Sequence, residues 1–272
     1  MNYIKTWIGK KQIITDRLTP EMIKRFDVTV NGMGVVDERL LSGLHYVLGN
    51  EALPRDQLGV DSHPAKGGFL PPVELPRRMW AGSRINFYAQ LPVGQDIVKI
   101  STIADTDTKK SASGDLVFVT VTHDYKSDDE VLISENQTIV YRDAVPFKQT
   151  AAEDLPFHIY KKSVTPDTTQ LFRYSAITFN GHRIHYDQEY ACGTEGYPGL
   201  VVHGPLIATW LMNLAQEKRP GKNMRSFEFR GNAPAFVDNE IIILVLDEDC
   251  TALEARTTNG ALIMTAKAGF GH

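Results

Sequence analysis

The chain has 272 residues, a formal net charge of −4 and a pI near 6.1. This length is typical of about two average domains. A mildly acidic composition argues against nucleic acid as the main partner, because this net charge does not imply a basic surface that could bind phosphates. Two cysteines, Cys192 and Cys250, are too few for a disulfide framework or a metal-ligand set and indicate a reducing compartment.

The amino-terminal stretch MNYIKTWIGKKQIITDRL contains no apolar core of the length found in signal peptides. It also lacks the arginine and serine enrichment of an organelle transit peptide. No stretch of the chain approaches the roughly 20 apolar residues that a membrane helix requires. We therefore expect a cytoplasmic protein with no membrane partner.

The first half begins with helical signals and continues with strands. Thr19-Pro20-Glu21 has the pattern of an N-cap, a first-turn proline and an acidic first turn, which predicts a helix through Phe26. Residues 37–48 repeat apolar side chains at helical spacing and predict a second helix. Residues 49–76 are rich in Pro, Gly and charge and predict a long loop of the kind that is often functional. Alternating and β-branched residues then predict strands at 80–90, 96–105, 116–125 and 131–141.

The second half repeats this plan after residues 143–165, which have the composition of a linker. A strand is predicted at 171–178 and a helix at 205–216. Further strands are predicted at 226–231, 240–247, 251–257 and 261–267. Consecutive strands without βαβ alternation are typical of an α+β fold, with an antiparallel sheet packed on a long central helix in each half. We predict two domains, residues 1–145 and 146–272.

Residues 171–205, LFRYSAITFNGHRIHYDQEYACGTEGYPGLVVHGP, combine the features expected of an active site. Here a predicted strand leads into a polar loop that carries His182, His185 and Asp187. Gly199 to Pro205 then leads into the predicted helix. A histidine-bearing loop followed by a glycine at a helix start supplies a base and backbone donors, as catalysis requires.

The same stretch resembles the hydratase motif of the MaoC-like hotdog family. That motif runs small residue, Gly, Asp, any residue, Asn, Pro, aliphatic, His, five residues, Ala, and residues 178–185 align with it. His185 and Ala191 fall in register, as does His203-Gly204, which opens the hotdog helix in that family. TFNGHRIHYD followed by GYPGLVVHGP resembles one branch, the 3-hydroxyacyl-thioester dehydratases of mitochondrial fatty-acid synthesis and the bacterial mesaconyl-C4-CoA and itaconyl-CoA hydratases. The resemblance extends through PRRMWAGSRI at residues 76–85.

This resemblance implies a double hotdog, with a degenerate first hotdog and a catalytic second one. It also implies that His185 acts as a base and that the Gly204 N–H stabilises an oxyanion. The usual aspartate of the motif is Asn180 here, as in the dehydratase branch. An amide cannot accept a proton as a base, although it can orient water. His185 therefore acts either alone or with His182.

Several other side chains are candidates for substrate contacts, each with a structural alternative. Arg183 either pairs with a substrate anion or is a solvated charge, and His182 either assists catalysis or holds the loop. Tyr174 and Tyr186 either line the acyl pocket or fill the core. Asp187 either orients His185 or caps a turn, with the cap favoured. Three arginines before or on a predicted strand could hold CoA phosphates or a carboxylate; they are Arg77, Arg78 and Arg84.

The resemblance implies a hydro-lyase that acts on an α,β-unsaturated acyl-CoA or acyl-ACP thioester without a metal or redox cofactor. We expect a short branched dicarboxylyl-CoA substrate, either itaconyl-CoA or mesaconyl-C4-CoA, converted to citramalyl-CoA. A 3-hydroxyacyl-ACP or -CoA dehydratase is the second interpretation. Because a fold does not dictate a function, a hotdog thioesterase and a non-catalytic thioester-binding subunit stay open. A homodimer is possible because dimerisation is common in this fold.

Overall fold

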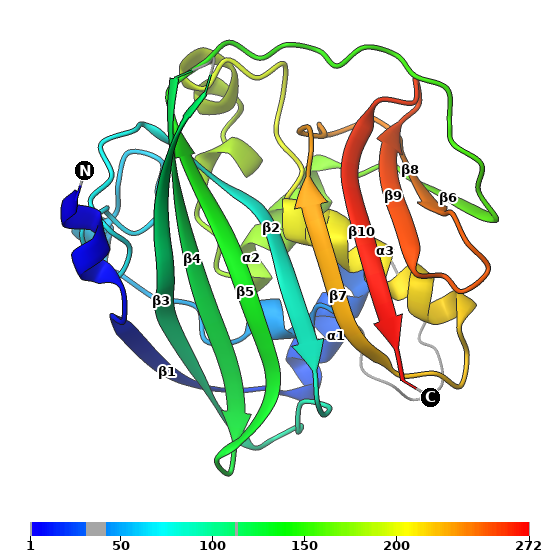
Figure 1. Ribbon diagram of the computed structural model, residues 1–272, viewed down its shortest axis with the longest axis horizontal. Coiled ribbons are helices and arrows are strands. Elements are labelled where there is room, and N and C mark those ends of the chain that lie inside the picture. The colour runs from blue at the N-terminus through cyan, green and yellow to red at the C-terminus, as the bar shows by residue number, and fades with distance from the viewer. Residues whose placement is uncertain (1, 31–41, 112–113, 272) are drawn as a thin grey trace.

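The computed structural model describes residues 2–30, 42–111 and 114–271. Within these ranges the strands form one ten-stranded antiparallel sheet (Figure 1). One part of the sheet comprises, in spatial order, β1 (Lys11–Arg17), β3 (Asp96–Ser111), β4 (Gly114–Ser127), β5 (Glu130–Arg142) and β2 (Arg77–Phe87). The other part continues with β7 (Met224–Gly231), β10 (Leu262–Phe270), β9 (Ala252–Thr257), β8 (Ile241–Val245) and β6 (Tyr160–Val164). Pairing of β2 with β7 joins the two parts.

Eight of the nine predicted strands are confirmed, as β2–β5 and β7–β10, with shifts at their ends; β3 runs on to Ser111, beyond the predicted end at 105. β1 was not predicted. Its sequence, KQIITDR, alternates only between exposed and half-buried positions. An edge strand of this kind buries no apolar face, so it carries no strong period-two signal.

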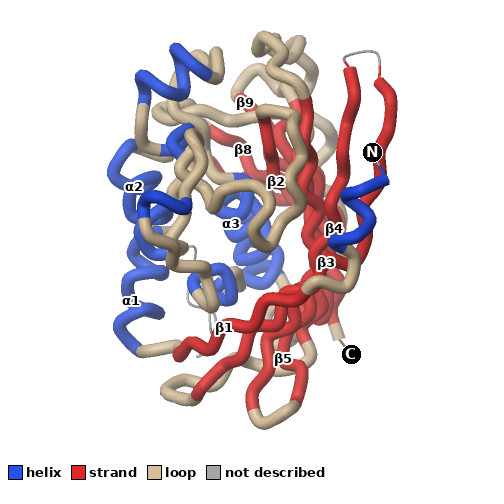
Figure 2. Tube along the Cα trace, turned by 90° about the vertical axis from the view of Figure 1, so that its left-hand side faces the viewer, coloured by secondary structure: helices blue, strands red, loops and turns tan. Residues whose placement is uncertain are grey.

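The three α-helices of the described ranges, α1 (Pro20–Thr29), α2 (Thr168–Ile177) and α3 (Gly204–Lys218), lie on one side of the sheet (Figure 2). The predicted helices at 19–26 and 205–216 are confirmed by α1 and α3. The Thr19 hydroxyl caps α1 by accepting a hydrogen bond of 3.2 Å from the Met22 N–H. α3 is buried continuously from Pro205 to Ala215, as expected of the central helix of a sheet-wrapped core. In the part of the chain that the structure describes, no helix is long and apolar enough to cross a membrane.

The predicted strand at 171–178 is wrong, because residues 171–177 belong to α2 and Thr178 is its C-cap. The Asp167 side chain caps the helix by accepting a hydrogen bond of 2.7 Å from the Gln170 N–H. Burial falls on Gln170 and Leu171, then on Tyr174 and Ser175. This spacing follows the helical period, so the apparent alternation was too short to decide between strand and helix.

Two other expectations need correction. Residues 37–41 of the predicted helix at 37–48 lie outside the described ranges, and Leu44–Val47 form a short 3-10 helix rather than an α-helix. The predicted linker at 143–165 ends in a strand, β6, which pairs with β8. Glu153 also anchors this segment, through its ion pair with Arg256 at 2.9 Å.

The main core spans both halves of the chain. A single cluster of buried side chains includes Leu18, Phe26 and Ile85 from the first half and most of α3 from the second. The Trp210 indole N–H donates to the Val30 carbonyl at 3.2 Å, which ties α3 to the end of α1. α3 therefore holds the two parts of the molecule together, and the domain boundary at 145–146 stays a prediction.

Candidate active site

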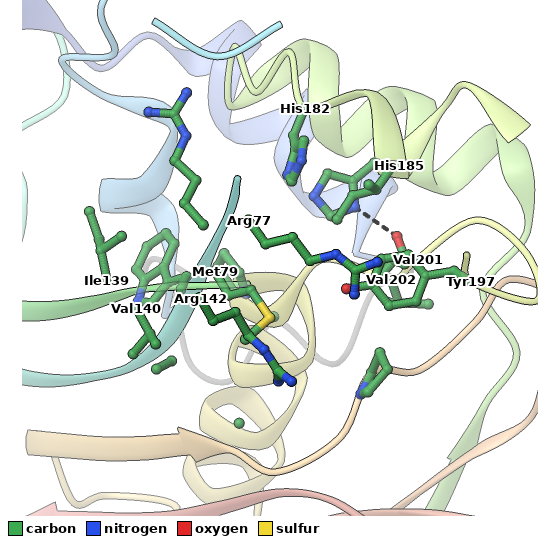
Figure 3. A pocket seen from close by; sticks show the side chains of 18 of the residues that line it. Arg77, Met79, Ile139, Val140, Arg142, His182, His185, Tyr197, Val201 and Val202 are labelled. Carbon is green, nitrogen blue, oxygen red and sulfur yellow. Dashed lines mark hydrogen bonds between the residues drawn. The ribbon is translucent and has the colours of Figure 1, made fainter. Parts of the chain in front are cut away.

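A cavity of about 860 Å³ opens between the two parts of the sheet and the loops above them (Figure 3). Its lining comes from Glu51, residues 63–70, β2, β5, residues 145–150, the segments 180–207 and 231–235, and two residues of β10, Ile263 and Met264. Asn180, His182, His185 and Gly204, all predicted from the sequence, line it together. Two parts of the chain that are distant in sequence thus build one site.

The histidine loop is shaped by its own hydrogen bonds. After α2, Phe179 adopts a positive φ of 49°, and the Asn180 N–H donates to the Ser175 carbonyl at 2.8 Å. The Asn180 side-chain oxygen then accepts a hydrogen bond of 3.0 Å from the His182 N–H. An asparagine that bonds to the backbone two residues later stabilises a tight turn. This turn directs His182 and His185 toward the cavity.

His185 is held in one tautomer. Its Nδ1 lies 2.7 Å from the Val201 carbonyl oxygen (Figure 3). A carbonyl can only accept, so Nδ1 carries the proton and Nε2 keeps its lone pair. Burial lowers the pKa of His185 to about 4, because a charged imidazole is poorly solvated there. At neutral pH the ring is an uncharged base.

His203, at the N-cap of α3, stacks on His185. The ring centroids are 3.6 Å apart and the planes are inclined by 20°. The His203 Nε2 lies 2.8 Å from the Ser175 hydroxyl, and the side chain is completely buried. Burial first, and then the neighbouring His185, lower the pKa of His203. His203 does not line the cavity, so it positions the entry to α3 and supports the His185 ring.

His63 is a cavity residue that the motif did not identify. It lies in the predicted loop at 49–76, and its ring centroid is 4.5 Å from that of His182. The loop packs tightly against the histidine loop: a Cβ on Gly181 would lie 2.8 Å from the Ser62 carbonyl oxygen. The Asp61 carbonyl also accepts a hydrogen bond of 3.1 Å from the Arg183 N–H. The length of the loop suggested a function, but no spacing pattern indicated His63.

This histidine cluster predicts that the protein loses stability in mild acid. Burial lowers the pKa values of His63, His182, His185 and His203. In the unfolded chain histidine titrates near 6.5, so below that pH the unfolded state binds more protons than the folded state. Stability should therefore fall as the pH drops from about 6.5 toward 4, by up to about 1.4 kcal/mol per pH unit for each histidine.

Urea unfolding at pH 7 and pH 5 measures this loss. The His63→Asn variant should show a shallower pH dependence than the wild type, because one of the titrating groups is absent. Equal free energies of unfolding at the two pH values would contradict burial of neutral imidazoles.

Gly204 contributes a backbone donor at the first position of α3. The N–H groups of Leu206 and Ile207 donate to the His203 carbonyl, and Pro205 has no N–H. Among the described residues the Gly204 N–H has no acceptor, and a Cβ on Gly204 would meet no atom within 4 Å. A donor at a helix N-terminus that faces open space suits an oxyanion.

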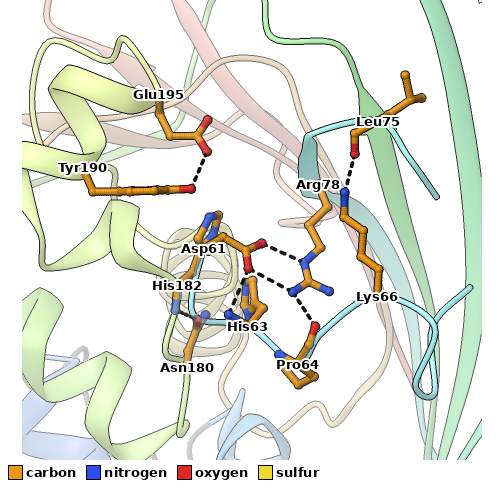
Figure 4. A network of polar contacts seen from close by, with 10 residues as sticks. All are labelled: Asp61, His63, Pro64, Lys66, Leu75, Arg78, Asn180, His182, Tyr190 and Glu195. Carbon is orange, nitrogen blue, oxygen red and sulfur yellow. Dashed lines mark hydrogen bonds and ion pairs between the residues drawn. The ribbon is translucent and has the colours of Figure 1, made fainter. Parts of the chain in front are cut away.

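Arg77 and Arg78 line the cavity, and both are engaged by the protein itself. The Arg77 Nε lies 2.9 Å from a Glu195 carboxylate oxygen, and Arg77 also donates to the Glu195 carbonyl. The Arg78 Nε lies 3.2 Å from Asp61, and its Nη2 donates to the Pro64 carbonyl (Figure 4). Both guanidinium groups are thus held in place, which fixes the wall of the cavity.

The structure does not bring four predicted substrate-binding residues to the cavity. Arg183 pairs with Asp187 at 2.7 Å, and the Asp187 carboxylate also caps the next turn through the Tyr190 N–H. The predicted cap role of Asp187 agrees with this geometry. The other three are Arg84, which pairs with Glu228 on the exposed sheet surface, Tyr174, which is fully buried, and Tyr186, which is exposed and donates to the Gly181 carbonyl.

The fold and the site define a double hotdog protein with a histidine loop and a helix N-terminus on one cavity. The model of the hydroxyacyl-thioester dehydratase type 2 family matches residues 43–237. Mesaconyl-C4-CoA hydratase of Chloroflexus aurantiacus is 38% identical, over 97% of both chains. The chain therefore belongs to the hydroxyacyl-thioester dehydratase type 2 family.

Solved structures support the fold. A MaoC-like dehydratase from Phytophthora capsici superposes with a TM-score of 0.70 at 12% identity, over 100% of this chain and 98% of that chain. A Mycobacterium tuberculosis protein described as a double hotdog superposes with a TM-score of 0.59 at 10% identity, over 97% of this chain and 96% of that chain. The predicted α+β double hotdog is thus confirmed.

Proposed function

We propose that this protein is a hydro-lyase that adds or removes water across the α,β double bond of an acyl thioester. The observation that carries the proposal is His185, whose Nδ1 is fixed on the Val201 carbonyl and whose ring lines the cavity. Gly204, at the first position of α3, lines the same cavity. A neutral base and a backbone donor on one cavity suit a reaction that develops an enolate oxygen.

In the hydration direction, the His185 Nε2 takes a proton from water while the water oxygen attacks C3 of the enoyl thioester. The π electrons of the double bond move toward the thioester carbonyl oxygen and form an enolate. The Gly204 N–H and the dipole of α3 stabilise that oxygen. Transfer of the proton from His185 to C2 completes the addition, and the thioester bond stays intact. Dehydration follows the same steps in reverse.

Asn180 is proposed to orient the water. Its side-chain oxygen is used by the His182 N–H, which leaves the amide N–H groups to donate to the water oxygen. Burial and the neighbouring His63 and His185 lower the pKa of His182, so it is neutral and can only assist by hydrogen bonding or proton relay. His185 remains the principal base in this mechanism.

For the substrate, we propose a short branched dicarboxylyl-CoA such as mesaconyl-C4-CoA or itaconyl-CoA, hydrated to citramalyl-CoA. The 38% identical relative is named as a mesaconyl-C4-CoA hydratase, and the cavity lining includes an arginine, Arg142, that suits an anionic substrate. A 3-hydroxyacyl-ACP or -CoA dehydratase is the second candidate, favoured by the family match over residues 43–237.

Hydration is redox-neutral, so the proposed reaction requires no redox cofactor, and CoA or acyl-carrier pantetheine enters as part of the substrate. In the described ranges no group of three or more His, Cys, Asp or Glu side chains is placed to hold a metal ion. We further propose that the protein works in the cytoplasm, and that residues 1–145 form a wall while residues 146–272 carry the chemistry.

A substrate panel tests the proposal: kcat/KM for mesaconyl-C4-CoA, itaconyl-CoA, crotonyl-CoA and a longer linear enoyl-CoA. We expect at least about tenfold preference for a branched dicarboxylyl thioester, the discrimination given by one extra charge-assisted contact. Preference for the linear thioesters would favour the dehydratase. Release of free CoA would indicate a thioesterase, and recovery of every thioester unchanged would indicate a binding subunit.

A further inference from the structure

The arginines considered as anion ligands differ in whether the protein neutralises their charge. Four of them have a carboxylate partner within 3.2 Å, namely Arg77 with Glu195, Arg78 with Asp61, Arg84 with Glu228 and Arg183 with Asp187. These four are the arginines that the sequence suggested as anion ligands. A guanidinium whose charge is already matched by a carboxylate of the protein is a poor candidate for binding a substrate anion.

Arg142 has no such partner. It is the last residue of β5, lies opposite Arg77 in the β2–β5 ladder and is half-buried. Its side chain lines the cavity beside Met79 and Arg77 (Figure 3). Its backbone pairs with β2 and β4, but among the described residues its guanidinium group makes no hydrogen bond or ion pair. Arginine stays charged at all physiological pH values and presents five donors.

Carboxylates in the cavity lining do not balance its positive charges. The Glu195 carboxylate is already used by Arg77 and by the Tyr190 hydroxyl, which donates to it at 3.2 Å. Both Arg77 and Arg142 act on Tyr197, a cavity residue, and oppose the rise of its pKa that burial causes. Lys148 adds another positive charge to the lining and Glu51 adds a negative one. The surplus on this wall is positive.

We propose that Arg142 binds an anionic oxygen group of the substrate and thereby determines which thioesters the cavity accepts. The group is either the free carboxylate of a dicarboxylyl chain or a phosphate of CoA. Carboxylate and phosphate both accept two parallel hydrogen bonds from a guanidinium. This inference rests on the proposed thioester site.

Binding of saturated thioesters, which cannot be hydrated, tests it without depending on catalysis. Isothermal titration calorimetry compares methylsuccinyl-CoA, butyryl-CoA and S-butyryl-pantetheine on the wild type, Arg142→Gln and Arg142→Lys. Arg84→Gln is the matched control, because Arg84 lies on the exposed sheet surface and pairs with Glu228. Thermal unfolding shows whether each variant is as stable as the wild type. If Arg142→Gln unfolds at a lower temperature than the wild type, Arg142→Lys is used in its place.

If Arg142 binds the acyl carboxylate, Arg142→Gln should weaken the binding of methylsuccinyl-CoA by about 10- to 100-fold and leave the affinity for butyryl-CoA nearly unchanged. If Arg142 binds a phosphate, the affinity for both CoA thioesters should fall, while the affinity for S-butyryl-pantetheine should not change. The inference would be overturned if Arg142→Gln bound each ligand as tightly as the wild type does, or if the variant bound all three ligands more weakly by the same factor. It would also be overturned if the wild type bound none of them. A wild type that binds these thioesters but hydrates no enoyl-CoA would refute the proposed function alone.

Discussion

Replacing His185 with asparagine should lower the rate of water addition by about 10²- to 10⁴-fold, the usual contribution of a general base. The asparagine amide can still donate to the Val201 carbonyl, which His185 contacts at 2.7 Å through Nδ1. It has no group in place of Nε2 that could take a proton from water. The loss should therefore appear in kcat, with a smaller change in KM, when initial rates are measured at pH 7.5.

The control is His158→Ala. His158 lies outside the cavity, and its Nδ1 contacts the Pro156 carbonyl at 2.9 Å. Protonation of His185 should not lower the wild-type kcat/KM until the pH approaches 4. The imidazole is neutral above its pKa of about 4, and it can no longer act as a base once the pH falls below that value. A His185→Asn enzyme with wild-type kcat would remove His185 from the mechanism.

Replacing Gly82 with alanine should destabilise the junction between the two parts of the sheet by about 3 kcal/mol, as overpacking does. A Cβ at this position would lie 2.3 Å from the Phe229 carbonyl oxygen, across the β2–β7 ladder. That oxygen belongs to the backbone and cannot rotate away, so the strands must separate. Since β2 also carries Arg77 and Arg78, the cavity should be distorted as well, and kcat/KM should fall.

Gly231 provides a matched control at the same junction. A Cβ there would lie 3.7 Å from the Ala81 carbonyl oxygen, which is ordinary van der Waals contact. Urea unfolding should therefore place Gly231→Ala within about 0.5 kcal/mol of the wild type, as for most substitutions without a steric conflict. If Gly82→Ala and Gly231→Ala unfolded at the same urea concentration, close packing of β2 against β7 would not be the reason for glycine at position 82.

Much of this architecture follows from local sequence signals. Alternating apolar residues predict β2–β5 and β7–β10, and strong caps and spacing predict α1 and α3. His182, His185 and Gly204 were placed on one site by the motif, and the structure brings them to one cavity. These features depend on residues that are close in the chain.

The features that sequence reasoning missed depend on distant residues. The exception is α2, because the run at 171–178 is too short to distinguish the period of a strand from that of a helix. His63 and Arg142 reach the cavity only because the loop at 49–76 and the end of β5 fold onto the histidine loop and β2. The pairing of Arg77 with Glu195 likewise joins residues that are far apart in sequence. No spacing pattern contains that information.

The most direct test of the central claim is the fate of water labelled with oxygen-18. The wild-type enzyme is incubated with mesaconyl-C4-CoA in labelled water, and the products are analysed by mass spectrometry. Our account predicts that the label appears as a hydroxyl on the acyl chain, that the CoA thioester remains intact, and that His185→Asn forms almost none of this product. Label in a free carboxylate together with released CoA would contradict it.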